Sequence, residues 1–78
     1  MVRVRLFAVL RELAGTSRAE VAGRSVGEVA DALTTAHGDR FGRIVAVSSF
    51  VVNGERATRD TVVADGDEVA ILPPVSGG

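Results

Sequence analysis

One segment of this 78-residue chain has a complete helix pattern, and strand patterns lie on both sides of it. Ser25 is followed three residues later by Glu28, the capping box in which each side chain satisfies a free backbone N–H at a helix start. Gly38 lies where a left-handed C-cap belongs. The apolar residues between these ends recur at helical spacing at Val26, Val29, Ala30, Leu33, and Ala36 or His37. Any core must therefore be built against this one main helix.

The residues before the helix predict two paired strands. Residues 1–10 alternate between two sets of side chains, which is the pattern of a half-buried strand. One set is Val2, Val4, Leu6, Ala8 and Leu10, and the other is Arg3, Arg5, Phe7 and Val9. Gly15 then marks a turn or a helix stop. Residues 18–22 predict a second strand, which forms a hairpin with the first.

The residues after the helix predict further strands. Residues 50–52 lead into Asn53 and Gly54, a strong hairpin signal because both residues tolerate the positive φ of a type I′ turn. Residues 55–57 pair back after this turn. Residues 68–72 predict a last strand.

The order of these elements predicts the fold class. A chain of this length supplies one hydrophobic core and therefore one domain. Strands, a helix and further strands predict an α+β fold of the ubiquitin-type β-grasp, with a mixed sheet packed on one main helix. A ferredoxin-like split βαβ fold is the main alternative, but it needs a second long helix, and residues 39–47 fit only a short helix or a loop. We expect a domain over residues 1–72 and a flexible tail over residues 73–78.

Composition and charge exclude several classes of function. The net charge is −1, which argues against a protein that tracks nucleic-acid phosphates. The chain has no cysteine and one histidine, so a thiolate metal site, a cysteine nucleophile and a His-based relay are not expected. Asp65, Asp67 and Glu68 offer too few ligands for a cation site and are read as a solvated turn. No apolar run approaches the ~20 residues of a membrane helix, and no signal peptide is evident, so the cytoplasm is the expected location.

The end of the sequence carries the most specific functional signal. Its residues are Pro73, Pro74, Val75, Ser76, Gly77 and Gly78. The prolines cannot donate to a sheet ladder, so they end the last strand and stiffen the exit. Six residues span at most about 20 Å, enough to reach a partner's active site, and glycine passes through a narrow channel because it has no Cβ. The carboxylate of Gly78 is unreactive at neutral pH until an external enzyme activates it. A frayed terminus is the alternative for two glycines alone.

With these residues the sequence resembles the MoaD-type small subunits of molybdopterin synthase, which are ubiquitin-like sulfur carriers of the MoaD/ThiS family. The likeness spans the whole chain and is most specific at its closing stretch, whereas the helix matches only in pattern. The matching segments are Leu6-Phe7-Ala8, Arg11-Glu12-Leu13-Ala14-Gly15, Val52-Asn53, Asp65-Gly66-Asp67-Glu68-Val69-Ala70 and the tail from Pro73 to Gly78.

The resemblance implies a cycle in two complexes. An E1-like, MoeB-type enzyme uses ATP to adenylate the carboxyl of Gly78, and a sulfurtransferase system converts it to a thiocarboxylate. The tail then enters the large, MoaE-type subunit, which supplies the catalytic residues. Two rounds of sulfur delivery convert cyclic pyranopterin monophosphate into molybdopterin. The chain is then no enzyme on its own and binds no cofactor, and because it lacks cysteine, carried sulfur must sit on the terminal carboxyl.

The resemblance also implies an apolar partner interface that includes Phe7 and Leu72, with Arg11 beside it. The strand pattern agrees for Phe7, because its parity is that of the two arginines of the first strand, which points it away from the core. For Leu72, packing under a loop is an equal alternative. Arg56 is a departure, since the family can have an apolar interface residue there.

Two other functions fit the same residues. A sulfur carrier for thiazole or cysteine synthesis shares the fold and the Gly-Gly end, although Arg-Glu-Leu-Ala-Gly in the first loop and Pro-Pro before the tail favour the molybdopterin branch. A ubiquitin-like interaction module without carboxyl chemistry is the second alternative. Such a module would keep its binding when Gly78 is removed.

Overall fold

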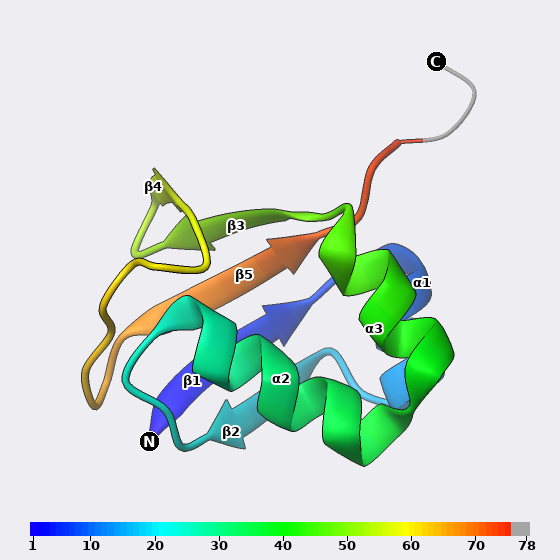
Figure 1. Ribbon diagram of the computed structural model, residues 1–78, viewed down its shortest axis with the longest axis horizontal. Coiled ribbons are helices and arrows are strands. Elements are labelled where there is room, and N and C mark those ends of the chain that lie inside the picture. The colour runs from blue at the N-terminus through cyan, green and yellow to red at the C-terminus, as the bar shows by residue number, and fades with distance from the viewer. Residues whose placement is uncertain (76–78) are drawn as a thin grey trace.

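Residues 1–75, the part of the chain that the computed structural model describes, form a five-stranded mixed sheet and three helices. The sheet has the order β2-β1-β5-β3-β4, with β1 and β5 parallel and the other neighbours antiparallel (Figure 1). The strands are β1 (Val2–Leu6), β2 (Arg18–Val21), β3 (Ser49–Val52), β4 (Glu55–Ala57) and β5 (Glu68–Leu72). This topology is the ubiquitin-like β-grasp, so the predicted fold is confirmed and the ferredoxin-like alternative is excluded.

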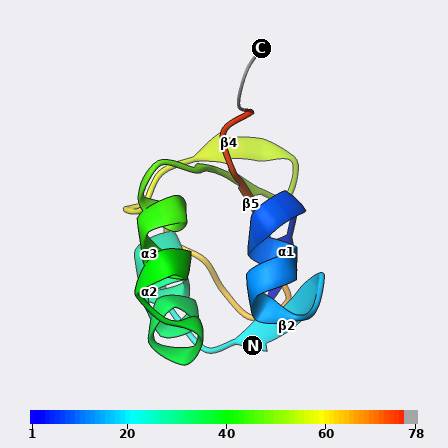
Figure 2. The same ribbon diagram turned by 90° about the vertical axis from the view of Figure 1, so that its right-hand side faces the viewer.

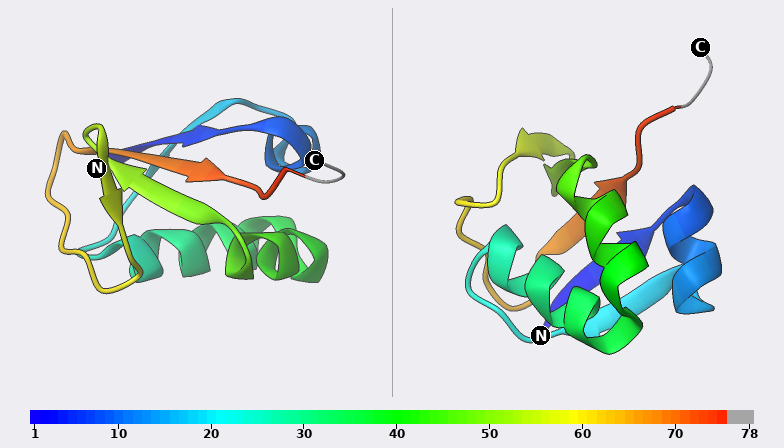
Figure 3. Two further views of the ribbon diagram at one scale, coloured as in Figure 1. Left: turned by 90° about the horizontal axis from the view of Figure 1, so that it is seen from above. Right: turned by 45° about the vertical axis from the view of Figure 1, so that its right-hand side comes forward.

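The helices are unevenly distributed around the sheet. They are α1 (Ala8–Ala14), α2 (Val26–His37) and α3 (Asp39–Ala46). α2 and α3 cover one face, and α1 lies at the end of the sheet toward which β1 and β5 run (Figure 2). Within residues 1–75, no helix covers the opposite face (Figure 3). None of these helices is long and apolar enough to cross a membrane.

The core lies between the sheet and the helices. Alternate residues of the strands point into it, as their period-2 burial shows. The buried apolar side chains are Val2, Val4, Leu6, Leu10, Val26, Val29, Ala30, Leu33, Phe41, Val45, Phe50, Val63, Val69 and Ile71. Phe41 on α3 has no exposed surface. Residues 39–46, which the sequence allows as a helix or a loop, therefore form a helix that supplies Phe41 and Val45 to the core.

The predicted strand over residues 1–10 is wrong in its second half. β1 ends at Leu6, and α1 begins at Ala8, whose φ of 52° turns the chain sharply out of the sheet. Leu10 is fully buried, and the partly buried Leu13 packs against the core, so the apolar residues follow helical spacing here. The predicted stop at Gly15 is confirmed, because it ends α1 in the left-handed conformation with φ 75°.

The ends of α2 agree with the sequence pattern, with two corrections. Ser25 Oγ accepts a hydrogen bond from the Glu28 N–H at 3.1 Å. The Glu28 carboxylate accepts from the N–H of Arg24, also at 3.1 Å, rather than from that of Ser25. Gly38 has the positive φ expected of a glycine stop, but its ψ of −178° is not that of a left-handed C-cap, because α3 begins at the next residue.

The acidic turn before β5 is held by bonds within the fold. Asp65 forms an ion pair of 2.7 Å with the N-terminal ammonium of Met1, whose hydrogen bond and charge lower the pKa of that carboxyl. Asp67 accepts hydrogen bonds from the N–H of Ala64 and from the amide of Asn53, and these lower its pKa. No group of three potential metal-ligating side chains occurs in residues 1–75.

Candidate functional site

The chain leaves the sheet at the end where the two central strands β1 and β5 both stop. The two strands are parallel neighbours, and their register pairs Leu6 with Ile71. The residues that follow this pair, Phe7 and Leu72, therefore lie at the same end of the sheet. The last described residues extend away from the body of the molecule at the end where α1 lies (Figure 1 and Figure 2).

The strand that carries this exit is firmly anchored. β5 is hydrogen-bonded to β1 on one side and to β3 on the other, and Val69 and Ile71 have no exposed surface. Pro73 is half-buried, Pro74 is exposed, and Val75 is 91% exposed. Because neither proline has an N–H, the sheet cannot continue past Leu72. The rest of the predicted tail, Ser76, Gly77 and Gly78, lies outside the described residues.

The face of the sheet opposite the core carries an apolar surface beside this exit, which we call the outer strip. Its members are the half-buried Phe7, Val51, Ala70 and Leu72. Alternation with Val69 and Ile71 places Ala70 and Leu72 on this face, and the register pairs Ala70 with Val51. Leu72 thus points away from the core and is half-buried on this face.

Phe7 is held in place by β1 and by α1. Its extended backbone, with φ −124° and ψ 154°, continues the parity of Arg5, as predicted. The guanidinium carbon of Arg5 lies 5.3 Å from the centroid of the Phe7 ring, which is a cation–π distance. The Phe7 carbonyl accepts a hydrogen bond of 3.1 Å from the N–H of Leu10, whose side chain is fully buried. The ring is therefore held at the exit and remains partly accessible.

Of the two arginines that the resemblance brings into question, Arg56 is placed beside the outer strip by the strand register, whereas Arg11 is on α1. Arg11 is exposed in the last turn of α1, where a positive charge complements the helix dipole. Arg56 is exposed on β4 and is the register partner of Val51. A charged side chain therefore borders the outer strip at the position where the family can have an apolar residue.

Sequence reasoning missed two members of the outer strip. Parity counted from the buried Val69 would have found Ala70 on the same face as Leu72. Val51 has no such signal, because its place beside Ala70 depends on the register between β3 and β5.

The described part of this site consists of apolar side chains and an extended chain end, and the histidine lies elsewhere. His37, the one histidine of the sequence, is half-buried, and its ring packs 5.1 Å from that of Phe41 on the helix side of the sheet. His37 therefore lies on the opposite side of the sheet from the outer strip. This end of the sheet therefore combines an apolar surface with a chain segment that extends outward from the central strand β5.

Comparisons with known proteins agree with this geometry. The ThiS family matches residues 4–78. The chain is 42% identical to small archaeal modifier protein 1 of Haloferax volcanii, over 95% of this chain and 97% of that one. It is 38% identical to the molybdopterin synthase sulfur carrier subunit of Escherichia coli, over the full length of both. The solution structure of small archaeal modifier protein 1 from Methanosarcina acetivorans superimposes with a TM-score of 0.88 at 32% identity, covering 99% of this chain and 95% of that one.

Proposed function

Because the chain belongs to the ThiS family of ubiquitin-like sulfur carriers, we propose that it is the sulfur-carrying small subunit of a molybdopterin synthase, with the carboxyl group of Gly78 as its working group. The observation that carries the proposal is the exit of the chain from a central strand, through two prolines, beside the outer strip. The end of the sheet where β1 and β5 stop thereby combines a docking surface with a chain end that can reach into the docked partner.

The chemistry follows from the ionisation of the terminal carboxyl group. It is an anion at neutral pH and therefore a poor electrophile. In the first complex, an E1-like, MoeB-type enzyme binds ATP, and an oxygen of the Gly78 carboxylate attacks the α-phosphorus while pyrophosphate leaves. A sulfur nucleophile from a sulfurtransferase then attacks the acyl carbon of the adenylate, and AMP leaves. This nucleophile is the terminal sulfur of a persulfide, so an acyl disulfide forms. A second thiol then attacks the sulfurtransferase's own sulfur, and the thiocarboxylate leaves with the electron pair of the broken S–S bond while a disulfide remains on the sulfurtransferase.

In the second complex, the tail delivers this sulfur to a pterin held by the large, MoaE-type subunit. Phe7 and Leu72 dock on that subunit, and the six residues from Pro73 to Gly78 span at most about 20 Å into its active site. Gly77 and Gly78 have no Cβ, which allows a narrow channel around them. The large subunit supplies the catalytic residues in this scheme, and both complexes belong in the cytoplasm, where ATP is available.

The choice of pathway rests on two observations. The Escherichia coli relative, whose name includes molybdopterin synthase, matches over the full length of both chains. The Arg-Glu-Leu-Ala-Gly segment forms the second half of α1 and its Gly15 cap, at the end of the sheet where the chain exits. Carriers for thiazole or cysteine synthesis would use the same carboxyl chemistry and would differ in the partner that the outer strip fits.

A second candidate function is covalent attachment to other proteins. The relative from Haloferax volcanii, at 42% identity, is named a modifier protein. The adenylate of Gly78 that precedes sulfur transfer is equally an acyl donor to an amine. Both functions therefore share the activation step and diverge in the nucleophile that accepts the acyl group.

Reconstitution tests the proposed pathway. The thiocarboxylated chain is combined with a MoaE-type large subunit and cyclic pyranopterin monophosphate, and we expect molybdopterin to form in proportion to the thiocarboxylate added. The matched control is the same chain without Gly78, which should fold normally and give no product. Failure of the loaded chain, with a large subunit shown to work with another carrier, would refute the molybdopterin assignment.

A further inference from the structure

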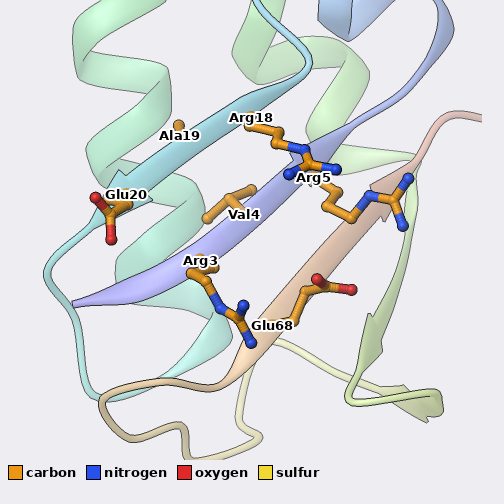
Figure 4. Close-up of a pocket in the computed structure, with 7 residues that line it drawn as sticks. All are labelled: Arg3, Val4, Arg5, Arg18, Ala19, Glu20 and Glu68. Carbon is orange, nitrogen blue, oxygen red and sulfur yellow. The ribbon is translucent and has the colours of Figure 1, made fainter.

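The outer face of the sheet has a charged hollow next to the outer strip. It has a volume of about 650 Å³ and lies over β1, β2 and the start of β5 (Figure 4). Its charged lining residues are Arg3, Arg5, Arg18, Glu20 and Glu68. All three arginines are exposed. The hollow is therefore a polar extension of the face that the proposed function assigns to docking.

The strand register sorts these charges into two rows. In one row, Arg3 lies between Glu20 on β2 and Glu68 on β5. In the other row, Arg5 is the direct partner of Arg18. On its other side Arg5 has Ala70, which is uncharged. The first row thus has two carboxylates for one guanidinium, and the second has two guanidiniums and no carboxylate.

The second row works against folding. Like charges directly opposite each other on antiparallel strands destabilise the pair. Neither Arg5 nor Arg18 forms an ion pair with a carboxylate of residues 1–75. Arg3, by contrast, donates a hydrogen bond of 3.2 Å to the carbonyl of Gly66. The fold therefore leaves the charges of Arg5 and Arg18 uncompensated, although the whole chain has a net charge of only −1.

The hollow and the outer strip are continuous at Arg5. Its guanidinium lies over the Phe7 ring at 5.3 Å, so a protein that covers Phe7 also covers Arg5 and, across the strand pair, Arg18. Burying two guanidiniums without an anion is costly, whereas a carboxylate can bind a guanidinium fork with two parallel hydrogen bonds. The partner therefore needs an acidic side chain at this position.

We propose that Arg5 and Arg18 bind an acidic segment of the large subunit that receives the tail, an inference that rests on the proposed function. The alternating rows favour a protein over a polyanion. A nucleic acid or polyphosphate that approached Arg5 and Arg18 would also meet Glu20 and Glu68, which repel it. A protein surface can place a carboxylate over the second row and a basic side chain over the first.

The test compares two variants of Arg18 with a matched control. Arg18→Gln removes one charge of the pair, and Arg18→Glu puts a carboxylate opposite Arg5. Arg40→Gln on α3 removes one exposed charge on the helix side of the molecule. We expect the Kd for the large subunit, measured calorimetrically, to rise at least about tenfold for Arg18→Gln and further for Arg18→Glu. Arg40→Gln should leave it unchanged.

Thermal unfolding separates this binding role from a structural one. Both Arg18 variants should unfold at the wild-type temperature or above it, because they remove a like-charge pair. A wild-type Kd in both variants would overturn the proposal, as would an equal loss for Arg40→Gln. Shifts of the Arg5 and Arg18 Nε–Hε resonances on adding inorganic polyphosphate, with the partner Kd unaffected, would assign the pair to a polyanion instead. If the wild-type chain itself did not bind the large subunit, the proposed function would fail and this inference with it.

Discussion

Replacing Phe7 with alanine should weaken partner binding while it destabilises the fold much less than the same change at Phe41, which provides the matched comparison. The two residues are chemically identical and differ in their surroundings. Phe41 on α3 has no exposed surface and lies at the centre of the core. Phe7 is half-buried just after the end of β1, where the guanidinium of Arg5 lies over its ring.

The structure sets the size of each effect. Truncating a fully buried phenylalanine costs about 3–5 kcal/mol of unfolding free energy. Half-burial of Phe7 contributes about half of the ~1.5–3 kcal/mol of a fully buried side chain, and the cation–π contact with Arg5 adds roughly 0.5–1 kcal/mol. We therefore expect Phe7→Ala to cost about 1.3–2.5 kcal/mol and Phe41→Ala about 3–5 kcal/mol. A central apolar anchor of an interface is worth about 2 kcal/mol or more, which is roughly a thirtyfold rise in Kd for Phe7→Ala.

Urea unfolding and calorimetric titration with the large subunit measure the two effects on the same samples. Phe41→Ala, studied in water at a temperature where it is folded, should keep the wild-type Kd. A stability loss for Phe7→Ala as large as that for Phe41→Ala would show that Phe7 belongs to the core. An unchanged Kd for Phe7→Ala would show that the partner does not dock on the outer strip.

Three further predictions concern the fold. Ser25→Ala removes the side-chain acceptor of the Glu28 N–H and should lower the unfolding free energy by about 1 kcal/mol in urea titrations, whereas Ser25→Asp should retain most of it. Gly42→Ala would place a Cβ 2.5 Å from Thr34 Cγ2 and should cost about 1–3 kcal/mol, with a smaller cost in a Thr34→Ala background; equal costs in both backgrounds would contradict this contact. The pKa values of Asp65 and Asp67 are lowered from 3.8 in the folded state, so their contribution is present above that pH and is lost as the pH falls below about 4; acid titration of Asp67→Asn should show a smaller decline than that of the wild type.

Much of the sheet could be predicted because its signals are local. The residue pair Asn53-Gly54 predicted a type I′ hairpin, and the φ values of 49° and 86° have the positive sign that this turn requires. The buried Val2, Val4 and Leu6 follow the predicted alternation. The parallel pairing of β1 with β5, by contrast, joins segments more than sixty residues apart, and no local signal in the sequence predicts it.

The first helix was missed because its residues satisfy two periodicities. Ala8 and Leu10 continue the alternation of β1, whereas Leu10, Leu13 and Ala14 also have helical spacing. Tertiary packing decides between the two periodicities. The helix turns Leu10 into the core, where it is fully buried, whereas a strand that continued straight to residue 10 would carry this side chain past the end of the sheet. The positive φ of Ala8 that allows this turn has no signal in the sequence, because alanine rarely adopts it.

The exit of the chain through the two prolines could be predicted from the sequence, whereas the surface beside it could be predicted only in part. The two prolines and the glycines are adjacent in the sequence, so the exit could be recognised directly. Leu72 was left open between the surface and a loop because a single parity cannot show which elements cover a face. The pairing of Arg5 with Arg18 depends on the register between β1 and β2, which residue identity alone does not reveal.

The measurement that tests the central claim most directly is the intact mass of the chain after incubation with an E1-like activating enzyme, ATP and a sulfur donor. We predict a gain that corresponds to one oxygen replaced by sulfur, located by fragmentation on the peptide that ends in Gly78. A chain extended by one residue beyond Gly78 is the control and should fold equally well and gain nothing. Sulfur found elsewhere in the chain, sulfur on the unprocessed extension, or no gain with an activating enzyme that loads another carrier would contradict the account.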